Sequence, residues 1–241
     1  DNKKAIANRG NLFRLKQVMR RAEAGEPVKV GFIGGSITMG CLATEPELCY
    51  AYRVYEWWQE KFPKTEVSYI NAGIGATTSQ FAAARVEKDL LDQKPDVVFV
   101  EFSVNDDANE FFMETYESLI RKIYTFDQNT AIIIINCVRY DDGGSAEVWH
   151  AKVARYYELP QISMQRSIYP EVAAGRISAE EITADYLHPN DIGHKLVAGV
   201  IESFLEEVYT EREQKEAEEE EKAPLTEASY QHAVRYRNDN C

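Results

Sequence analysis

The chain of 241 residues is short of positive charge: 27 lysine and arginine residues stand against 40 aspartate and glutamate residues, for a formal net charge of −13. So acidic a surface repels nucleic acids and anionic membranes, and we exclude both as partners. Long apolar runs are also missing, since no stretch reaches the roughly 18 residues of a membrane-spanning helix. Apolar residues still make up 44% of the chain, which is enough for a core and argues against global disorder.

Cysteine is scarce, and its spacing excludes the common metal sites. The chain has four cysteines, at positions 41, 49, 137 and 241. They form no CxxC pair and no Cys/His cluster with zinc spacing, so we expect no metal site. We expect no other cofactor either, because the sequence lacks a phosphate-binding fingerprint. Such scattered usage is typical of cytosolic proteins, so we expect a cytoplasmic location and no disulfide between Cys41 and Cys49. A signal peptide removed from in front of Asp1 would instead indicate secretion.

Phosphate-binding fingerprints are also absent. The stretch VGFIGGSITMG at residues 30–40 reads as a strand that runs into a glycine-rich turn. It lacks the lysine of a P-loop and the GxGxxG spacing of a dinucleotide-binding loop, which disfavours a nucleotide- or flavin-binding protein. Taken alone, the stretch fits a sharp turn in which Ser36 caps the next helix.

Apolar runs alternate with amphipathic segments along most of the chain. Strands are predicted at residues 28–33, 66–71, 96–103, 131–138 and 160–164. Helices are predicted at residues 11–24, 50–62, 78–92, 114–127, 145–158 and 190–209. Continuous apolar strands separated by helices indicate an α/β protein with a parallel sheet covered on both faces, a doubly wound three-layer α/β/α sandwich. In such sheets the active-site loops follow the carboxyl ends of the strands.

The sequence changes character after this pattern ends, and three segments are predicted. Residues 1–210 form the main domain. Residues 211–224 include an acidic run without an apolar face, which predicts a solvated helical extension or a linker. Residues 225–241 alternate in polarity like a strand. We expect them to begin a truncated second domain of β type. If they are ordered, they must pack on a neighbour or on the main domain, because one strand cannot fold alone.

Polar residues gather where the sheet rule places active-site loops. His188 is a candidate base for the hydroxyl of Ser36, and Asp185, three residues earlier, can orient the imidazole. The amides of Ser36 and Gly73 and the side-chain amide of Asn105 can donate to the oxyanion of a tetrahedral intermediate. Together these residues predict a serine hydrolase.

Four sequence blocks, in order, resemble those of the SGNH (GDSL-type) hydrolase superfamily. The blocks are Gly34-Gly35-Ser36, a block centred on Gly73, Asn105-Asp106, and Asp185-Tyr186-Leu187-His188, within residues 28–207. The resemblance implies a flavodoxin-like sheet of five parallel strands and ester hydrolysis without a metal. It also implies that Ser36, Asp185 and His188 form the catalytic triad.

Two positions depart from the pattern of that superfamily. Gly35 stands where aspartate is common, which should mainly alter how the turn is braced. Ser103 stands where glycine is common, and its side chain could narrow the acyl pocket or hydrogen-bond the loop. We expect neither departure to abolish catalysis.

Substrate contacts are predicted at the same edge of the sheet. The loop after the fourth strand, residues 139–149, mixes aromatic, charged and flexible residues, a combination that suits a sugar ring. Tyr140 and Trp149 are the candidates there, although ordinary packing explains either residue equally well. Asp106 is a further candidate, with bracing of its loop as the main alternative.

The remaining histidines lack partners at metal-ligand spacing. His150 and His232 are therefore predicted to lie at the surface. His194 comes early in the last predicted helix, where it would face solvent or help to seat that helix.

The acyl group and the alcohol are predicted from the resemblance. Relatives with a GGS first block, a DxxHP last block and a trailing second domain resemble carbohydrate esterases that deacetylate hemicellulose. We therefore expect a serine esterase that removes O-acetyl groups from mannan- or xylan-derived saccharides, with an acetylated oligosaccharide or another small ester as its partner. A lysophospholipase or thioesterase on the same fold and a non-catalytic carbohydrate-binding relative stay open, as does assembly into a homo-oligomer.

Overall fold

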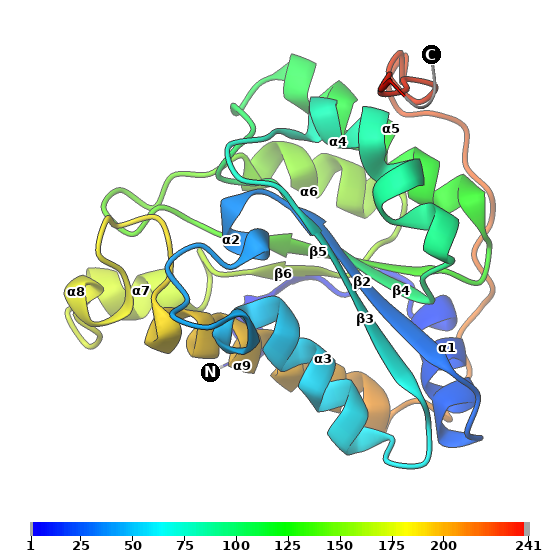
Figure 1. The fold of residues 1–241 in the computed structure, drawn as a ribbon, viewed down its shortest axis with the longest axis horizontal. Coiled ribbons are helices and arrows are strands. Elements are labelled where there is room, and N and C mark those ends of the chain that lie inside the picture. Colours follow the sequence, from blue (N-terminus) through cyan, green and yellow to red (C-terminus); the bar gives the residue numbers. More distant parts are fainter. Residues whose placement is uncertain (1, 239–241) are drawn as a thin grey trace.

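The computed structural model describes residues 2–238 and shows one central sheet between two layers of helices (Figure 1). The sheet has six strands in the order β1-β6-β5-β4-β2-β3. Their bounds are β1 Ile6–Asn8, β2 Val28–Gly34, β3 Val67–Gly73, β4 Val97–Glu101, β5 Ala131–Asn136 and β6 Gln161–Ser163. Strands β2 to β6 are parallel, which confirms the predicted flavodoxin-like arrangement of five.

The sixth strand corrects the predicted sheet. Strand β1 pairs antiparallel with β6 and forms an edge of the sheet. It has three residues, Ile6-Ala7-Asn8, which is too short for polarity alternation to reveal it. The pairing register also shifts between Ile6 and Asn8, so this edge is irregular.

The helices divide between the two faces of the sheet. Their bounds are α1 Phe13–Glu23, α2 Ser36–Met39, α3 Tyr50–Lys61, α4 Ser79–Asp89, α5 Glu110–Phe126, α6 Glu147–Tyr156, α7 Ile168–Ala173, α8 Ala179–Ile182 and α9 Asp191–Thr210. One buried apolar cluster joins α1, α3 and α9 to the sheet, and a second joins α4, α5 and α6 to the opposite face. Figure 1 shows the two groups on opposite sides of the strands, so the three-layer sandwich is confirmed.

Successive side chains of the central strands point to opposite faces of the sheet and pack in both apolar clusters. Phe32 of β2 stacks on Phe99 of β4 in the cluster with α1, α3 and α9, with ring centroids 4.8 Å apart. The next residue of each strand, Ile33 and Val100, joins the cluster with α4, α5 and α6. Because both faces of these strands are buried, the sequence reads as unbroken apolar runs.

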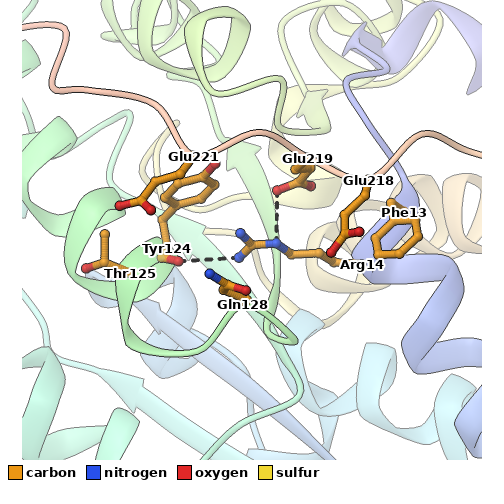
Figure 2. Close-up of a pocket in the computed structure, with 8 residues that line it drawn as sticks. All are labelled: Phe13, Arg14, Tyr124, Thr125, Gln128, Glu218, Glu219 and Glu221. Atoms are coloured by element: carbon orange, nitrogen blue, oxygen red, sulfur yellow. Dashed lines mark hydrogen bonds and ion pairs between the residues drawn. The ribbon is translucent and has the colours of Figure 1, made fainter.

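Residues 211–224 form no helical extension, and most of them are exposed. Helix α9 ends at Thr210, and the segment continues through a turn without further helix. Glu216 lies 3.0 Å from Nζ of the buried Lys16. Glu219 lies 2.9 Å from Nε of Arg14, and Figure 2 shows this ion pair. Two glutamates of the run thus pair with basic residues of α1, and these ion pairs hold an otherwise exposed segment against the main domain.

Residues 225–238 form no strand, so that expectation is wrong for the part of the tail that the structure describes. The tail lies along α5 and α4 instead (Figure 1). The backbone amide of Thr226 donates to the buried carboxylate of Glu117 at 2.8 Å, and Lys122 donates to the carbonyl of Ala233 at 2.6 Å. Side chains of α5 thus form hydrogen bonds with backbone groups of the tail that a neighbouring strand would otherwise bind. A second domain stays a prediction, and residues 239–241 lie outside the described part.

The sequence predicts neither a disulfide between Cys41 and Cys49 nor a membrane-spanning helix. Cys41, Cys49 and Cys137 are free thiols in the structure. Among residues 2–238, no helix combines the length and the apolar character needed to cross a membrane.

A carboxyl group is buried at the end of β4. Glu101 is fully buried, and its Oε1 atom lies 3.4 Å from the hydroxyl oxygen of Ser103. Its Oε2 atom has no hydrogen-bond partner among the described residues. Burial raises the pKa of Glu101 to about 8, an effect that the nearby carboxylate of Asp106 increases and hydrogen bonds from Ser103 oppose. Glu101 is therefore mainly protonated at neutral pH.

Glu101→Gln is expected to flatten the dependence of stability on pH. The pKa of Glu101 is higher in the folded chain than in the unfolded one, so its contribution to stability is complete in mild acid and is lost as pH rises to about 8. The uncharged glutamine has no such loss. Thermal unfolding midpoints measured from pH 5 to 9 should show the variant gaining several degrees on the parent protein toward alkaline pH.

The matched control is Glu110→Gln, which changes an exposed carboxylate at the start of α5. It should follow the parent curve throughout. Parallel curves for Glu101→Gln and the parent would show that Glu101 is ionised in the folded chain.

Candidate active site

Ser36 lies at the sharp turn that ends β2 and begins the short helix α2. The turn is tightly enclosed, because a Cβ atom at Gly34 would lie 2.1 Å from Oγ1 of Thr38 and 2.7 Å from the carbonyl oxygen of Glu101. Only glycine fits there. The turn leaves Ser36 partly exposed at the carboxyl end of the sheet, where the sequence predicts it.

The structure brings the three residues of the predicted triad together. The Oγ atom of Ser36 lies 2.8 Å from Nε2 of His188, although the two residues are 152 positions apart in the sequence. The Nδ1 atom of His188 lies 2.6 Å from Oδ2 of Asp185. This line of hydrogen bonds has the geometry in which an imidazole accepts the proton of a serine hydroxyl.

The loop that carries Asp185 and His188 is held from several sides. The amide of His188 donates to Oδ1 of Asp185 at 2.7 Å. Between them, Tyr186 has a φ of +61°, a left-handed conformation that is unfavourable for a bulky residue. Its carbonyl accepts a hydrogen bond from the amide of Tyr140 at 2.7 Å. The side chain of Asn190 then caps α9, so both ends of the loop are fixed.

Asp185 is ionised throughout the range in which an enzyme works. Burial alone would raise its pKa, but hydrogen bonds from the ring and amide of His188 and the amide of Leu187 outweigh that effect and lower the pKa to about 2. A permanent carboxylate at this position fixes the ring orientation of His188 and stabilises its protonated form.

The predicted amide donor at Gly73 is already occupied. The amide of Gly73 donates to Oδ1 of Asn71 at 2.8 Å. Farther along the same loop, the amides of Gly75 and Ala76 make no hydrogen bond within residues 2–238. The loop lies against the nucleophile, since a Cβ atom at Gly75 would be 3.8 Å from Cβ of Ser36. These two amides are better placed than that of Gly73 to bind an oxyanion.

Ala76 has an unusual backbone conformation that cannot be recognised from the sequence alone. Its φ is +55°, in the left-handed region that normally favours glycine. Sequence reasoning selects Gly73 because it is a glycine, whereas the residue in the unusual conformation is an alanine three positions later. A strained backbone next to Ser36 is typical of a functional loop.

Asn105 lies directly against the turn of Ser36. A Cβ atom at Gly35 would be 2.4 Å from Oδ1 and 2.9 Å from Nδ2 of Asn105. The Oδ1 atom is buried and has no hydrogen-bond partner in the described part of the chain. Gly35 therefore does more than alter the bracing of the turn, because its missing side chain leaves the space that the Asn105 amide occupies.

Asp106 is turned away from Ser36 and is not brought to the predicted substrate side. Its Oδ1 atom accepts a hydrogen bond from the amide of Ser79 at 2.9 Å, and its Oδ2 atom lies 3.0 Å from Nε2 of His150. The alternative that Asp106 braces its loop fits these contacts.

His150 is fully buried and stacks on Tyr116 with ring centroids 3.6 Å apart, so its predicted surface location is wrong. It lies on the buried side of α6, and its partner Asp106 is 44 positions earlier in the sequence.

His194 is also buried and connects α9 to the loop after Ser36. Its Nδ1 atom accepts a hydrogen bond from the amide of Tyr50 at 3.2 Å, and its Nε2 atom lies 3.1 Å from the carbonyl of Cys41. Burial lowers the pKa of His194. Of the two alternatives predicted for His194, the structure supports the one in which it helps to seat helix α9, and not the one in which it faces solvent. His232 is exposed, as predicted.

The predicted aromatic contacts are less open than expected. Tyr140 is buried, and the half-buried ring of Trp149 has Nζ of Lys152 over one face, 3.7 Å from its centroid. Two exposed side chains lie nearer to the triad in sequence or space. Tyr186 stands between Asp185 and His188, and the Met39 sulfur would lie 3.9 Å from a Cβ atom at Gly75. The place of Tyr186 inside the last block could have identified it.

No group of three or more histidine, cysteine, aspartate or glutamate side chains within residues 2–238 is arranged to hold a metal ion. The residues that surround Ser36 instead supply a base, a carboxylate and amide donors.

Comparisons with known proteins bear on this geometry. Residues 32–196 match the GDSL-like Lipase/Acylhydrolase family, and this range includes Ser36, Asn105 and His188. Two crystal structures of a two-domain esterase (CEX) active on acetylated mannans, one of them co-crystallised with mannopentaose, are 54% identical to this chain, with TM-scores of 0.97 and 0.93. The similarity covers 99% of this chain and 64% of that protein.

More distant relatives share the architecture. An acetylxylan esterase from Geobacillus stearothermophilus is 24% identical over 212 residues, which cover 76% of this chain and 95% of that protein. The crystal structure of Axe2, an acetylxylan esterase from the same organism, is 20% identical and gives a TM-score of 0.59 over 76% of this chain and 96% of its own length. At this level of identity the likeness concerns the fold alone.

Gly35→Ala is expected to impair turnover without unfolding the protein. The new methyl group would overlap the Asn105 amide and must displace it. If that amide stabilises the oxyanion, kcat on an activated acetyl ester should fall roughly 10²- to 10³-fold. Steady-state kinetics together with circular dichroism would measure both effects.

Gly199→Ala is the matched control, because a Cβ atom at Gly199 meets nothing within 4 Å. It should keep the parent rate. Equal rates for the two variants would mean that the position of Asn105 does not matter for catalysis.

Proposed function

Since the chain belongs to the GDSL-like lipase/acylhydrolase family, we propose that it is a serine esterase that removes O-acetyl groups from mannan- or xylan-derived saccharides. The observation that carries the proposal is the continuous line of hydrogen bonds from Ser36 through His188 to Asp185. The choice of substrate is supported by the relative at 54% identity, which is active on acetylated mannans, and by the acetylxylan esterase.

Acylation of Ser36 is the first half of the proposed reaction. Oγ of Ser36 attacks the acetyl carbonyl carbon while its proton passes to Nε2 of His188, 2.8 Å away. Asp185 stabilises the resulting imidazolium. When the tetrahedral intermediate collapses, the C–O bond to the sugar breaks and His188 returns the proton to the departing sugar hydroxyl. The acetyl group is then held as an ester of Ser36.

Deacylation repeats the same proton transfers with water. His188 accepts a proton from a water molecule whose oxygen attacks the acetyl-serine carbonyl. The second tetrahedral intermediate breaks its bond to Oγ of Ser36, which recovers its proton from His188. Acetate leaves, and the hydroxyl that began the cycle is restored.

Stabilisation of both intermediates falls to amides around Ser36. We assign this role to the amide of Ser36, to the loop amides of Gly75 and Ala76, and to the side-chain amide of Asn105. The loop amides have no competing partner within residues 2–238, so they need not break a hydrogen bond to receive the oxyanion. Preorganised donors of this kind supply a large part of the rate enhancement in acyl transfer.

The substrate proposal is tested with acetylated manno- and xylo-oligosaccharides. Mass spectrometry should record stepwise loss of acetyl units, and an activated acetyl ester should be cleaved faster than an octanoyl ester. Good cleavage of the octanoyl ester without loss of acetyl units would favour the lysophospholipase or thioesterase alternative. Absence of turnover on any activated acetyl ester would favour the non-catalytic carbohydrate-binding alternative.

Asp185→Asn is expected to lower kcat by as much as ~10⁴-fold while the fold is retained, because the neutral amide can hold the wrong tautomer of His188. The substitution removes the carboxylate that lies 2.6 Å from Nδ1. Asp92→Asn changes an exposed carboxylate that follows α4 and pairs with Lys88, and it should leave kcat unchanged. Comparable rates in the two variants would remove Asp185 from the proposed mechanism.

A further inference from the structure

A fully buried arginine lies beneath the loops of the candidate active site. Arg85 projects from α4, and its guanidinium group donates to the carbonyl of Ala72 at 2.7 Å and to that of Gly34 at 3.3 Å. Gly34 is the last residue of β2, and Ala72 is the second-last residue of the neighbouring strand β3. One side chain therefore bridges the two strand ends.

Each bridged carbonyl belongs to a segment that the proposed reaction uses. Gly34 precedes Ser36 by two residues, and Ala72 leads into the loop of Gly75 and Ala76. The amide of Ile74 also donates to the carbonyl of Gly34 at 3.1 Å, so the two segments meet directly above the guanidinium group. A shift of Arg85 would change the position of the nucleophile relative to the oxyanion donors.

The guanidinium group is held in turn by a carboxylate that the C-terminal tail also binds. Asp89 lies 3.2 Å from Arg85 through Oδ2. Its Oδ1 atom lies 3.0 Å from Arg235 and 3.2 Å from Arg237. The backbone amide of Arg235 donates to the carbonyl of Ala84 at 2.9 Å, which fixes the tail against α4. A continuous path of contacts thus runs from the tail to the turn of Ser36.

We propose that Arg85 is a positioning residue that keeps the Ser36 turn and the Gly75–Ala76 loop in register, and that Arg235 holds it in place through Asp89. The inference rests on the proposed esterase function. It gives the tail a role in catalysis at a distance from the reacting atoms, without any contact of the tail with substrate.

Burial supports a positional role over a purely stabilising one. A buried charge is costly, and replacing buried ion pairs by apolar side chains is often neutral for stability. What an apolar side chain cannot supply at position 85 is a donor for two carbonyls at once. Lysine cannot supply it fully either, because its single ammonium group lacks the planar fork of arginine. The expected loss therefore appears in the rate more than in substrate binding.

The experiment compares kcat and KM of the parent, Arg85→Met, Arg85→Lys and the exposed-arginine control Arg155→Gln on an activated acetyl ester. Arg85→Met should lower kcat on the order of 10²-fold with KM within about two-fold, since small misplacements of reacting groups have effects of this size. Arg85→Lys should recover part of the loss. If Arg85→Met does not fold, Arg85→Lys should still lower kcat at unchanged KM.

The role of the tail is tested with Arg235→Gln, which should lower kcat roughly 3- to 10-fold at unchanged KM. A parent protein that turns over no acetyl ester would contradict the proposed function itself. An active parent with kcat unchanged in the folded Arg85 variants would overturn the role of Arg85. Equal rates for Arg235→Gln and Arg155→Gln would overturn the role of the tail.

Discussion

The site depends on the absence of side chains where β2 turns into α2. At Gly34 there is no room for a Cβ atom between Thr38 and the β4 backbone, and at Gly35 there is none beside Asn105. This close approach lets Ser36 emerge at the end of the central strand with Asn105 next to it. His188, which is 152 positions later in the sequence, can then reach the hydroxyl of Ser36. The rest of the molecule supports this contact: the helices cover the sheet, and the loops around Ser36 are tied to it by buried polar groups.

Two His–Asp pairs are found within residues 2–238, and their surroundings separate their roles. His188 and Asp185 lie in a partly exposed loop, with Oγ of Ser36 at the remaining ring nitrogen. His150 and Asp106 are buried; the other ring nitrogen of His150 lies 3.4 Å from Asn136, and Asp106 also accepts the amide that begins α4. The first pair can exchange protons with a substrate. The second fixes the loop of Asn105 to α4 and α6.

Sequence reasoning identified the parallel sheet, its helical layers and the residues that meet at Ser36. It could do so because buried parallel strands read as apolar runs and because chemistry follows their carboxyl ends. The family match confirms the resemblance to GDSL-type hydrolases. Sequence reasoning could not select Ala76 over Gly73, because nothing in the sequence indicates that an alanine adopts the left-handed conformation.

Charge and polarity patterns were poorer guides to the ends of the chain. The acidic run of residues 211–224 is largely exposed, yet it forms no helix, and its Glu219 and Glu216 pair with Arg14 and the buried Lys16. The alternation of residues 225–238 looked like a strand, yet the backbone of the tail binds side chains of α5. Both contacts escape the sequence for one reason, which is that partners distant in sequence decide whether a charge or a backbone amide is satisfied by water or by protein.

The most direct measurement of the role of Ser36 is its reaction with a fluorophosphonate, followed by mass spectrometry of the intact protein and its peptides. An activated serine should give one stoichiometric adduct, located on the peptide that contains Ser36, and its formation should be slowed severely in a His188→Ala variant. No adduct, or an adduct on another residue, would contradict the assignment of Ser36 as the nucleophile.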